Sequence, residues 1–383
     1  DKTGASKGSY KLDSLRKDPS GKWPYDIVVN EPEQEFVLAY FPKARPGVES
    51  IVNVKSFKEG SVPSWSYDFE YSTSLGDLDI GQLQLTDNGT LYFLANGAFK
   101  STEEDKFLTS KYNTIFWCMY NPEKGLEKRI DLDLYDRLLL QPKIKIKENH
   151  CFFYAWYSID YKQLPEGVCI IKLNENFEEA HSQVHDFSSV EMLALNPNDR
   201  DDVLKSLELM DLVFIGENKK VLLAEINEKT ISQTGNGNGA NSGLTELYYS
   251  GTIYCMSLDA SLAPQNISSV KKRQSSANDN ARHSSFSSMT SDSTMALIFN
   301  DRGWNERRRS MGKSLKLAST EGRVKLNFAL MHGVKVFTPK QLDNPWRGSK
   351  TAVRDAVQMR DGHLYFLMKK GRNRSLMKVS FEK

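Results

Sequence analysis

The chain has 383 residues and a formal net charge of +2; 39% of its residues are hydrophobic and 26% are charged. A chain of this length and composition can bury a substantial core, which excludes wholesale disorder. The small net charge argues against a general nucleic-acid binder, and no run of 18 apolar residues predicts a membrane-spanning helix.

Short runs of Val, Ile, Phe and Tyr alternate with polar turns along most of the chain, which predicts an all-β protein. One pattern recurs, a turn rich in Asn, Asp, Glu or Gly followed by a tight apolar strand, as in 87–94 and 361–367. The strands of this pattern start at residues 36, 91, 152, 221, 296 and 364. Convincing helical spacing is confined to Asn198–Met210.

Six copies of one strand pattern predict a β-propeller with six blades. A large β-sandwich, or two stacked sandwiches, is the alternative that also contains many short strands. The segment Trp23–Val29 is expected to complete the last blade and close the ring. Residues 1–22 are then an N-terminal extension, and residues 23–383 form a single propeller domain.

Two segments of that domain have the composition of surface insertions. Residues 232–243 are rich in Gly and Asn, and residues 264–294 are rich in Ser and Asn. Neither composition offers much apolar surface to bury. We therefore predict mobile insertions at 232–243 and 264–294.

The repeated strand pattern, the closing strand Gly371–Phe381 and the Asn300-Asp301 pair after a strand resemble uncharacterised secreted or periplasmic propeller-like proteins of the Bacteroidetes type. The resemblance covers most of the chain. It implies a propeller fold and export to the periplasm or the medium. It supplies no catalytic residues.

Metal and cofactor sites are not expected from the sequence. Cys118, Cys151 and Cys169 lie in apolar runs, as core cysteines do, and the chain has no Cys-x-x-Cys spacing. His181 and His185 fall in a predicted strand, where residues four apart lie too far from each other to hold one ion. We therefore predict no metal and no cofactor.

The leading functional hypothesis is a non-enzymatic binding or scaffold module of the cell envelope, a monomer whose partner is a glycan or a protein. It depends on the absence of a metal cluster, a nucleophile–base pair and a cofactor motif. Planar aromatic and amide side chains suit the faces of sugars and peptides. Asn96, Asn300 and Trp304 are the candidate ligand-binding residues.

The alternative hypothesis is a carbohydrate-active hydrolase or lyase with carboxylates converging at the propeller axis. Glycoside hydrolysis uses two carboxyl groups, which different blades could supply. The candidates are Asp77, Asp79, Glu225 and Asp301. The basic cluster Arg307–Arg309 with Lys313 is either a solvated surface or a patch for anionic glycans or lipid headgroups.

Overall fold

The computed structural model is all-β, with short helices between some of its strands. It describes residues 25–30, 35–40, 50–58, 62–71, 75–86, 88–99, 113–132, 137–148, 150–159, 164–174, 176–196, 201–234, 243–319, 324–342, 350–358, 362–370 and 372–381. The chain divides into two compact units, one of residues 1–163 and 169–182 and the other of residues 164–168 and 183–383.

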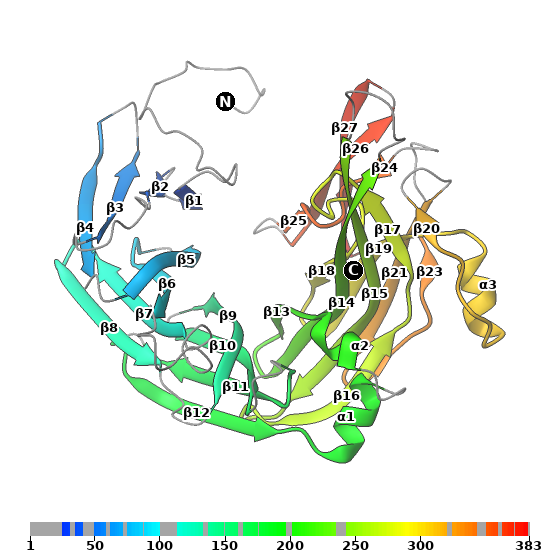
Figure 1. Ribbon diagram of the computed structural model, residues 1–383, viewed down its shortest axis with the longest axis horizontal. Coiled ribbons are helices and arrows are strands. Elements are labelled where there is room, and N and C mark those ends of the chain that lie inside the picture. The colour runs from blue at the N-terminus through cyan, green and yellow to red at the C-terminus, as the bar shows by residue number, and fades with distance from the viewer. Residues whose placement is uncertain are drawn as a thin grey trace. The chain divides into compact units, whose positions relative to one another are not determined.

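Residues 25–186 contribute three four-stranded sheets, each with its strands in sequence order (Figure 1). The first contains β1 Tyr25–Asn30, β2 Glu35–Tyr40, β3 Ser50–Phe57 and β4 Trp65–Tyr71. The second contains β5 Leu75–Leu85, β6 Leu91–Phe99, β7 Asn113–Asn121 and β8 Leu126–Leu132. The third contains β9 Leu138–Lys147, β10 His150–Ser158, β11 Gly167–Leu173 and β12 Glu179–Asp186.

Residues 207–379 contribute three further sheets. The fourth contains β13 Leu207–Ile215, β14 Lys219–Thr234, β15 Gly243–Leu258, β16 Pro264–Val270, β17 Gln274–Ala277 and β20 Ala318–Ser319. The fifth contains β18 Phe286–Thr290, β19 Thr294–Asp301, β21 Lys325–His332, β22 Lys335–Val336 and β23 Lys340–Gln341. The sixth contains β24 Lys350–Thr351, β25 Val357–Gln358, β26 Leu364–Lys370 and β27 Asn373–Val379.

The recurring apolar pattern of the sequence falls on the same kind of strand in every sheet. It lies in β2, β6, β10, β14, β19 and β26, each of which has neighbours on both sides. Residues 91–94, 152–154 and 221–224 are buried throughout, as expected, whereas in 364–367 Leu367 is 40% exposed. The predicted all-β class and the position of these strands are confirmed.

The predicted closure by the N-terminal segment is wrong for its described part. Strand β1 pairs antiparallel with β2, with Tyr25 opposite Tyr40, and is therefore the first strand of the first sheet. A pairing across a short connection costs less loop-closure entropy than one with the far end of the chain. Residues 1–24 lie outside the described residues.

Residues 264–294 are not the insertion that their composition suggested. They form β16, β17 and β18, and Val270, Phe286 and Met289 are buried. Because apolar residues recur between the serines, the segment can bury one face of each strand. Of the other predicted insertion, residues 232–234 end β14 and residues 235–242 lie outside the described residues.

The predicted helix over Asn198–Met210 is also largely wrong. Of its described residues, 201–210, only those of α2 (Asp201–Lys205) are helical, and Leu207 begins β13, which pairs with β14. Tertiary pairing of the aliphatic stretch overrides its helical spacing. The sequence analysis missed α1 (Ser189–Leu195), which has a capping box formed by Ser188 and Glu191.

Helix length rules out a membrane span in the described residues. Helices α1, α2 and α3 (Asn305–Ser310) contain seven, five and six residues. A helix that crosses a bilayer needs about 20. None of these could cross a membrane.

In the first unit, the core lies between the first and second sheets. Val37, Val54 and Phe69 from the first sheet pack in one cluster with Leu91 and Phe93 from the second. The rings of Phe69 and Phe93 meet edge to face with centroids 5.2 Å apart. Face-to-face packing of this kind buries one side of each sheet.

In the second unit, the fifth sheet packs on both of its faces. Along β19, Leu297 and Phe299 join a cluster with the fourth sheet, whereas Ala296 and Ile298 join a cluster with the sixth. Successive side chains of a strand point to opposite faces, so this alternation follows from the pleat. Strand β19 is therefore covered on both sides, and its last residues enter a region that excludes water.

Candidate functional site

The last two residues of β19 are the polar pair Asn300-Asp301, both of which are buried. Asn300 continues the face of Ile298, and its amide donates to the carbonyl oxygens of His283 (2.9 Å) and Thr351 (2.8 Å). Both N–H groups of this amide are used inside the protein. The geometry leaves neither for the ligand contact that we expected of Asn300.

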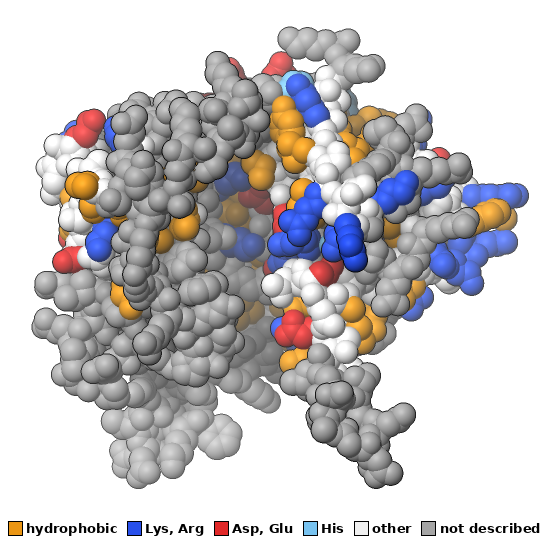
Figure 2. All heavy atoms as spheres, turned by 90° about the horizontal axis from the view of Figure 1, so that it is seen from above, with side chains coloured by type: hydrophobic (Ala, Val, Ile, Leu, Met, Phe, Trp, Pro, Cys, Tyr) orange, Lys and Arg blue, Asp and Glu red, His pale blue; other side chains and the backbone are white. Residues whose placement is uncertain are grey.

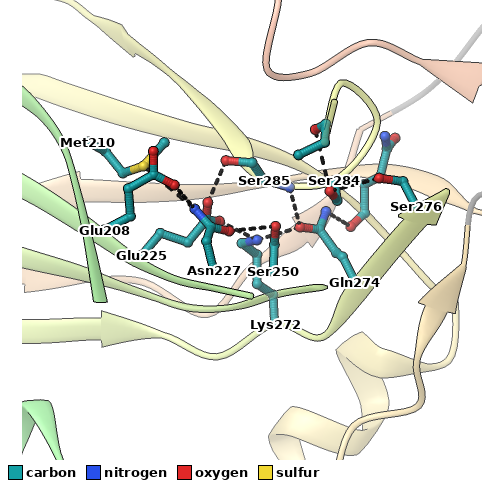
Figure 3. A network of polar contacts seen from close by, with 12 residues as sticks. Glu208, Met210, Glu225, Asn227, Ser250, Lys272, Gln274, Ser276, Ser284 and Ser285 are labelled. Atoms are coloured by element: carbon teal, nitrogen blue, oxygen red, sulfur yellow. Dashed lines mark hydrogen bonds and ion pairs between the residues drawn. The ribbon is translucent and has the colours of Figure 1, made fainter. Parts of the chain in front are cut away.

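A network of buried polar side chains lies beside Asn300, and it begins with an ion pair (Figure 3). The side chains of Glu225 and Lys272 contact each other and are both 0% exposed. Ser285 Oγ donates to Glu225, and Lys272 also donates to Gln274. A buried charge is tolerated when it is paired and hydrogen-bonded in this way. Burial lowers the pKa of Lys272, and the neighbouring Glu225 opposes this effect.

Gln274 connects the ion pair to β19 and to the segment that precedes β18. Its Nε2 donates to the carbonyl oxygen of Asn300 at 2.6 Å, and its Oε1 accepts from the backbone N–H of Ser285 at 2.9 Å. Separate contacts join β13, β14 and β15, where Asn227 donates to Glu208 at 2.6 Å and accepts from Ser250 at 2.7 Å (Figure 3). The contact of Gln274 with Asn300 joins the fourth and fifth sheets.

Asp301 is enclosed as completely as Glu225. Its side chain is 0% exposed, forms an ion pair with Arg309, and accepts hydrogen bonds from the backbone of Arg302 and from Asn305. Catalytic carboxylates must reach the substrate, and neither Glu225 nor Asp301 does. The prediction that they are active-site acids is corrected: both follow buried apolar runs and point into protein instead of a cleft.

The helix α3 is attached to this buried region by one face. Asn305 and Arg309 are four residues apart, which places them on one side of α3, and both contact Asp301 at the end of β19. Asn305 donates to the carbonyl oxygen of Lys316 and accepts from its backbone N–H, each at 2.8 Å. Arg309 Nε donates to the carbonyl oxygen of Lys271 at 2.8 Å. These contacts fix both the helix and the loop 311–316 that follows it.

The opposite side of α3 forms a pocket, which we call the α3 pocket. Its cavity volume is about 440 Å³. The lining residues are Arg302, Trp304, Arg307, Arg308, Met311, Lys313 and Lys316. Five of these seven carry a positive charge, and Glu306 of the same helix does not line the pocket. The cations therefore face the cavity without a carboxylate among the lining residues.

Trp304 gives the pocket an exposed aromatic surface. Its side chain is 72% exposed, although a large apolar ring would ordinarily be buried. Figure 2 shows Lys and Arg side chains gathered at the right-hand edge of the view, over the part of the chain that contains α3. A planar ring among cations can hold a ligand that has both an apolar face and negative charges.

The remaining candidate residues lie on β5, β6 and β12. Asp77 and Asp79 are on β5, and Asn96 is on β6 with its Cα opposite that of Asp79. Their side chains are outside the described residues. His181 and His185 are on β12, where His185 Nε2 lies 2.9 Å from Glu191. No group of three or more His, Cys, Asp or Glu residues in the described part of the chain is placed to hold a metal ion.

The sequence analysis missed part of the pocket. Arg302, Met311 and Lys316 were not named, although residues 302–316 contain six basic side chains and one acidic one. This charge imbalance within fifteen residues was the available signal.

No protein-family model matches this chain, and no curated protein sequence matches it. A solved polysaccharide lyase is similar over 94% of this chain and 77% of its own, with 10% identity and a TM-score of 0.49. The α-L-arabinofuranosidase of Fusarium graminearum is similar over 93% and 92%, with 8% identity and a TM-score of 0.39. A DUF4221 family member from Bacteroides vulgatus is similar over 85% and 94%, with 10% identity and a TM-score of 0.28.

These neighbours correct the leading functional hypothesis. The named activities belong to carbohydrate-active enzymes, whereas the sequence analysis expected a non-enzymatic binding or scaffold module. That hypothesis depended only on absent motifs and is not retained. At these identities and TM-scores, the similarities supply no argument about the substrate or the catalytic residues of this chain.

Proposed function

We propose that the protein is an exported, carbohydrate-active hydrolase or lyase that takes an acidic polysaccharide at the α3 pocket. The observation that carries the proposal is the lining of this pocket, five cations around the exposed ring of Trp304. Sugar rings present C–H faces that pack on an indole, and uronate or sulfate groups would meet the cations. The enzymatic part is the alternative that the sequence analysis had already raised.

The helix that carries the pocket is anchored from its other side, which favours binding. Asn305 and Arg309 both contact the buried carboxylate of Asp301, so the cationic side chains project from an anchored helix. Preorganisation reduces the entropy lost on association. Collected positive charge also raises the local concentration of an anionic polymer.

We further propose a six-bladed propeller as the architecture that carries this pocket. Six sheets of the described residues each place the recurring apolar strand between two neighbours. The covering of β19 on both faces is the packing expected of a blade strand.

The test begins with purified protein and a panel of polysaccharides: polygalacturonate, alginate and chondroitin sulfate as acidic probes, and dextran as a neutral one. Hydrolysis releases reducing ends, whereas elimination also leaves an unsaturated ring that absorbs ultraviolet light. Both signals are followed with each probe. We expect binding and cleavage of at least one acidic polymer and neither with dextran.

Two matched variants distinguish binding at the α3 pocket from binding that depends only on the overall positive charge. Arg307→Glu with Arg308→Glu reverses two cations of the α3 pocket, and Lys369→Glu with Arg374→Glu reverses two exposed cations of the β26–β27 hairpin. We expect at least about tenfold weaker binding for the first pair and little change for the second. Equal losses in both, or binding of dextran by the wild type, would contradict the proposal.

A further inference from the structure

A second cavity adjoins the α3 pocket in the same unit. Its volume is about 470 Å³. One wall is the end of β16 with Lys271, another is the segment from Arg309 to Leu315, and a third is the segment 336–339. Because Phe337 belongs to the third wall, we call this cavity the Phe337 pocket.

Lys313 lines both pockets, so they are neighbours on one surface. Residues 311–316, which include Lys313, are closed at their far end by the Asn305–Lys316 hydrogen bonds. A cation shared by two cavities is placed to meet a negative group that lies between them. The backbone of Lys313 is held within this loop by its N–H, which donates to the carbonyl oxygen of Arg308 at 2.9 Å.

Phe337 is a second exposed aromatic surface. Its side chain is 45% exposed, and Lys335 Nζ lies 5.3 Å from the ring centroid. The backbone N–H of Phe337 donates to the carbonyl oxygen of Leu330 at 2.8 Å, and the preceding Val336 packs against the core. The ring is therefore carried by an anchored backbone, as Trp304 is.

We infer that the substrate chain occupies both pockets at once, with one sugar unit on Trp304, another on Phe337 and an anionic group between them at Lys313. The inference rests on the proposed function and adds the minimum substrate to it, an oligosaccharide with repeated negative charges. The linear polymer places rings and charges at regular intervals, which matches two aromatic surfaces separated by a cation. A single lipid headgroup or a free anion would fill only one pocket.

A single-stranded nucleic acid also combines stacking rings with negative charge. The small net charge of +2 argues against a nucleic acid as the ligand, because nucleic-acid-binding domains usually carry a marked basic excess. The acidic polysaccharide is therefore the ligand that these residues favour. An oligodeoxynucleotide is tested as the competing ligand in the experiment below.

The experiment measures affinity by calorimetry for a mono-, di- and tetrasaccharide of the acidic polymer that the wild type binds. We expect affinity to rise at least about tenfold when the ligand becomes long enough to reach both pockets. Phe337→Ala should remove this rise, so that the tetrasaccharide binds about as weakly as the monosaccharide. Trp304→Ala should weaken every ligand. Val334→Ala, at a nearby exposed apolar side chain, is the control and should change nothing.

The outcomes separate the two proposals. If Phe337→Ala keeps the full dependence on chain length, the two-pocket inference is overturned while the α3 pocket stands. If Trp304→Ala binds as the wild type does, or if the wild type binds no acidic saccharide, the proposed function fails and the inference falls with it. Tighter binding of an oligodeoxynucleotide that is equally sensitive to both variants would overturn the polysaccharide assignment.

Discussion

The buried network and the α3 pocket use the same residue types in opposite ways. In the network, Glu225 with Lys272 and Asp301 with Arg309 are almost fully enclosed, and every charge has an opposite partner. In the pocket, five cations face solvent and no carboxylate lines the cavity. Arg308 and Arg309 are adjacent in sequence, yet one lines the pocket and the other holds a buried carboxylate.

The difference shows how charge should be interpreted in this protein. Buried and balanced charges hold neighbouring elements together, and they resist removal because a charge left without its partner is costly to keep away from water. Exposed and unbalanced cations contribute little to stability and retain their capacity to bind an anion. Substitutions in the two regions should therefore change different measurements.

The largest expected effect is on stability, from breaking the buried pair. Lys272→Met leaves Glu225 without its cation and should lower the free energy of unfolding by about 3–5 kcal/mol. Urea denaturation followed by intrinsic fluorescence measures this loss. Lys219→Met, at an exposed position of β14, is the control.

A double variant distinguishes pairing from simple loss of packing. Glu225→Leu with Lys272→Met removes both charges and should be less destabilising than the sum of the single substitutions. Additive losses would show that the two side chains do not stabilise each other.

The adjacent arginines provide the sharpest contrast. Arg309→Met should cost about 3 kcal/mol of unfolding free energy, because Asp301 loses its buried partner. Arg308→Met should cost less than about 0.5 kcal/mol and weaken polysaccharide binding instead. Paired denaturation and binding measurements on both variants test this, and the reverse pattern would refute the division of roles.

Salt should affect only one of the two regions. Raising the ionic strength from about 0.05 M to about 0.2 M should weaken polysaccharide binding by roughly tenfold, since the pocket cations are exposed. The urea midpoint should change little, because buried pairs are poorly screened. Salt-independent binding would mean that the cations do not carry the affinity.

The ion pair of Asp279 and His283 is intermediate in exposure between the buried pairs and the pocket cations. Asp279 Oδ2 is 2.7 Å from His283 Nδ1, and the side chains are 14% and 16% exposed. Although burial raises the pKa of Asp279, hydrogen bonds from His283 and Ser276 outweigh it and the pKa is lowered overall. The ionised carboxylate therefore stabilises the folded state above its unfolded pKa of about 3.9, and this stability is lost as the pH falls toward the lowered value.

Asp279→Asn should consequently cost about 1 kcal/mol near pH 6 and progressively less below about pH 4. Unfolding curves across this range measure the difference from wild type. Asp355→Asn, in the exposed pair with Arg282, serves as the comparison and should have little effect at any pH. A loss at Asp279 that is constant with pH would contradict the assignment.

The strand pattern was predictable from the sequence because it is local. A turn followed by an apolar run identifies β6 or β26 without knowledge of what covers it. The segment 264–294 was mistaken because its serines outweigh Val270, Phe286 and Met289 in composition, although those three residues decide its burial.

The candidate acids could not be resolved in the same way. The burial of Glu225 and Asp301 depends on which other segments cover the ends of their strands. Those segments are distant in sequence, so the sequence alone does not identify them. Trp304 was identified because a planar aromatic side chain suits the faces of sugars and peptides. Part of the division between Arg308 and Arg309 was available in principle, since Arg309 lies four residues after Asn305 and therefore on the same side of α3.

That spacing has a consequence for how the protein changes over evolution. Asp301, Asn305 and Arg309 anchor the segment, and Arg308 also holds the following loop through the carbonyl oxygen of Ser314. The side chains at 302, 304 and 307 line the pocket and take no part in these contacts. Mutations at these three positions can therefore accumulate without loss of folding. Related chains with the same anchors could present different side chains there and select different ligands, and a designer could graft a new recognition surface by exchanging these three positions alone.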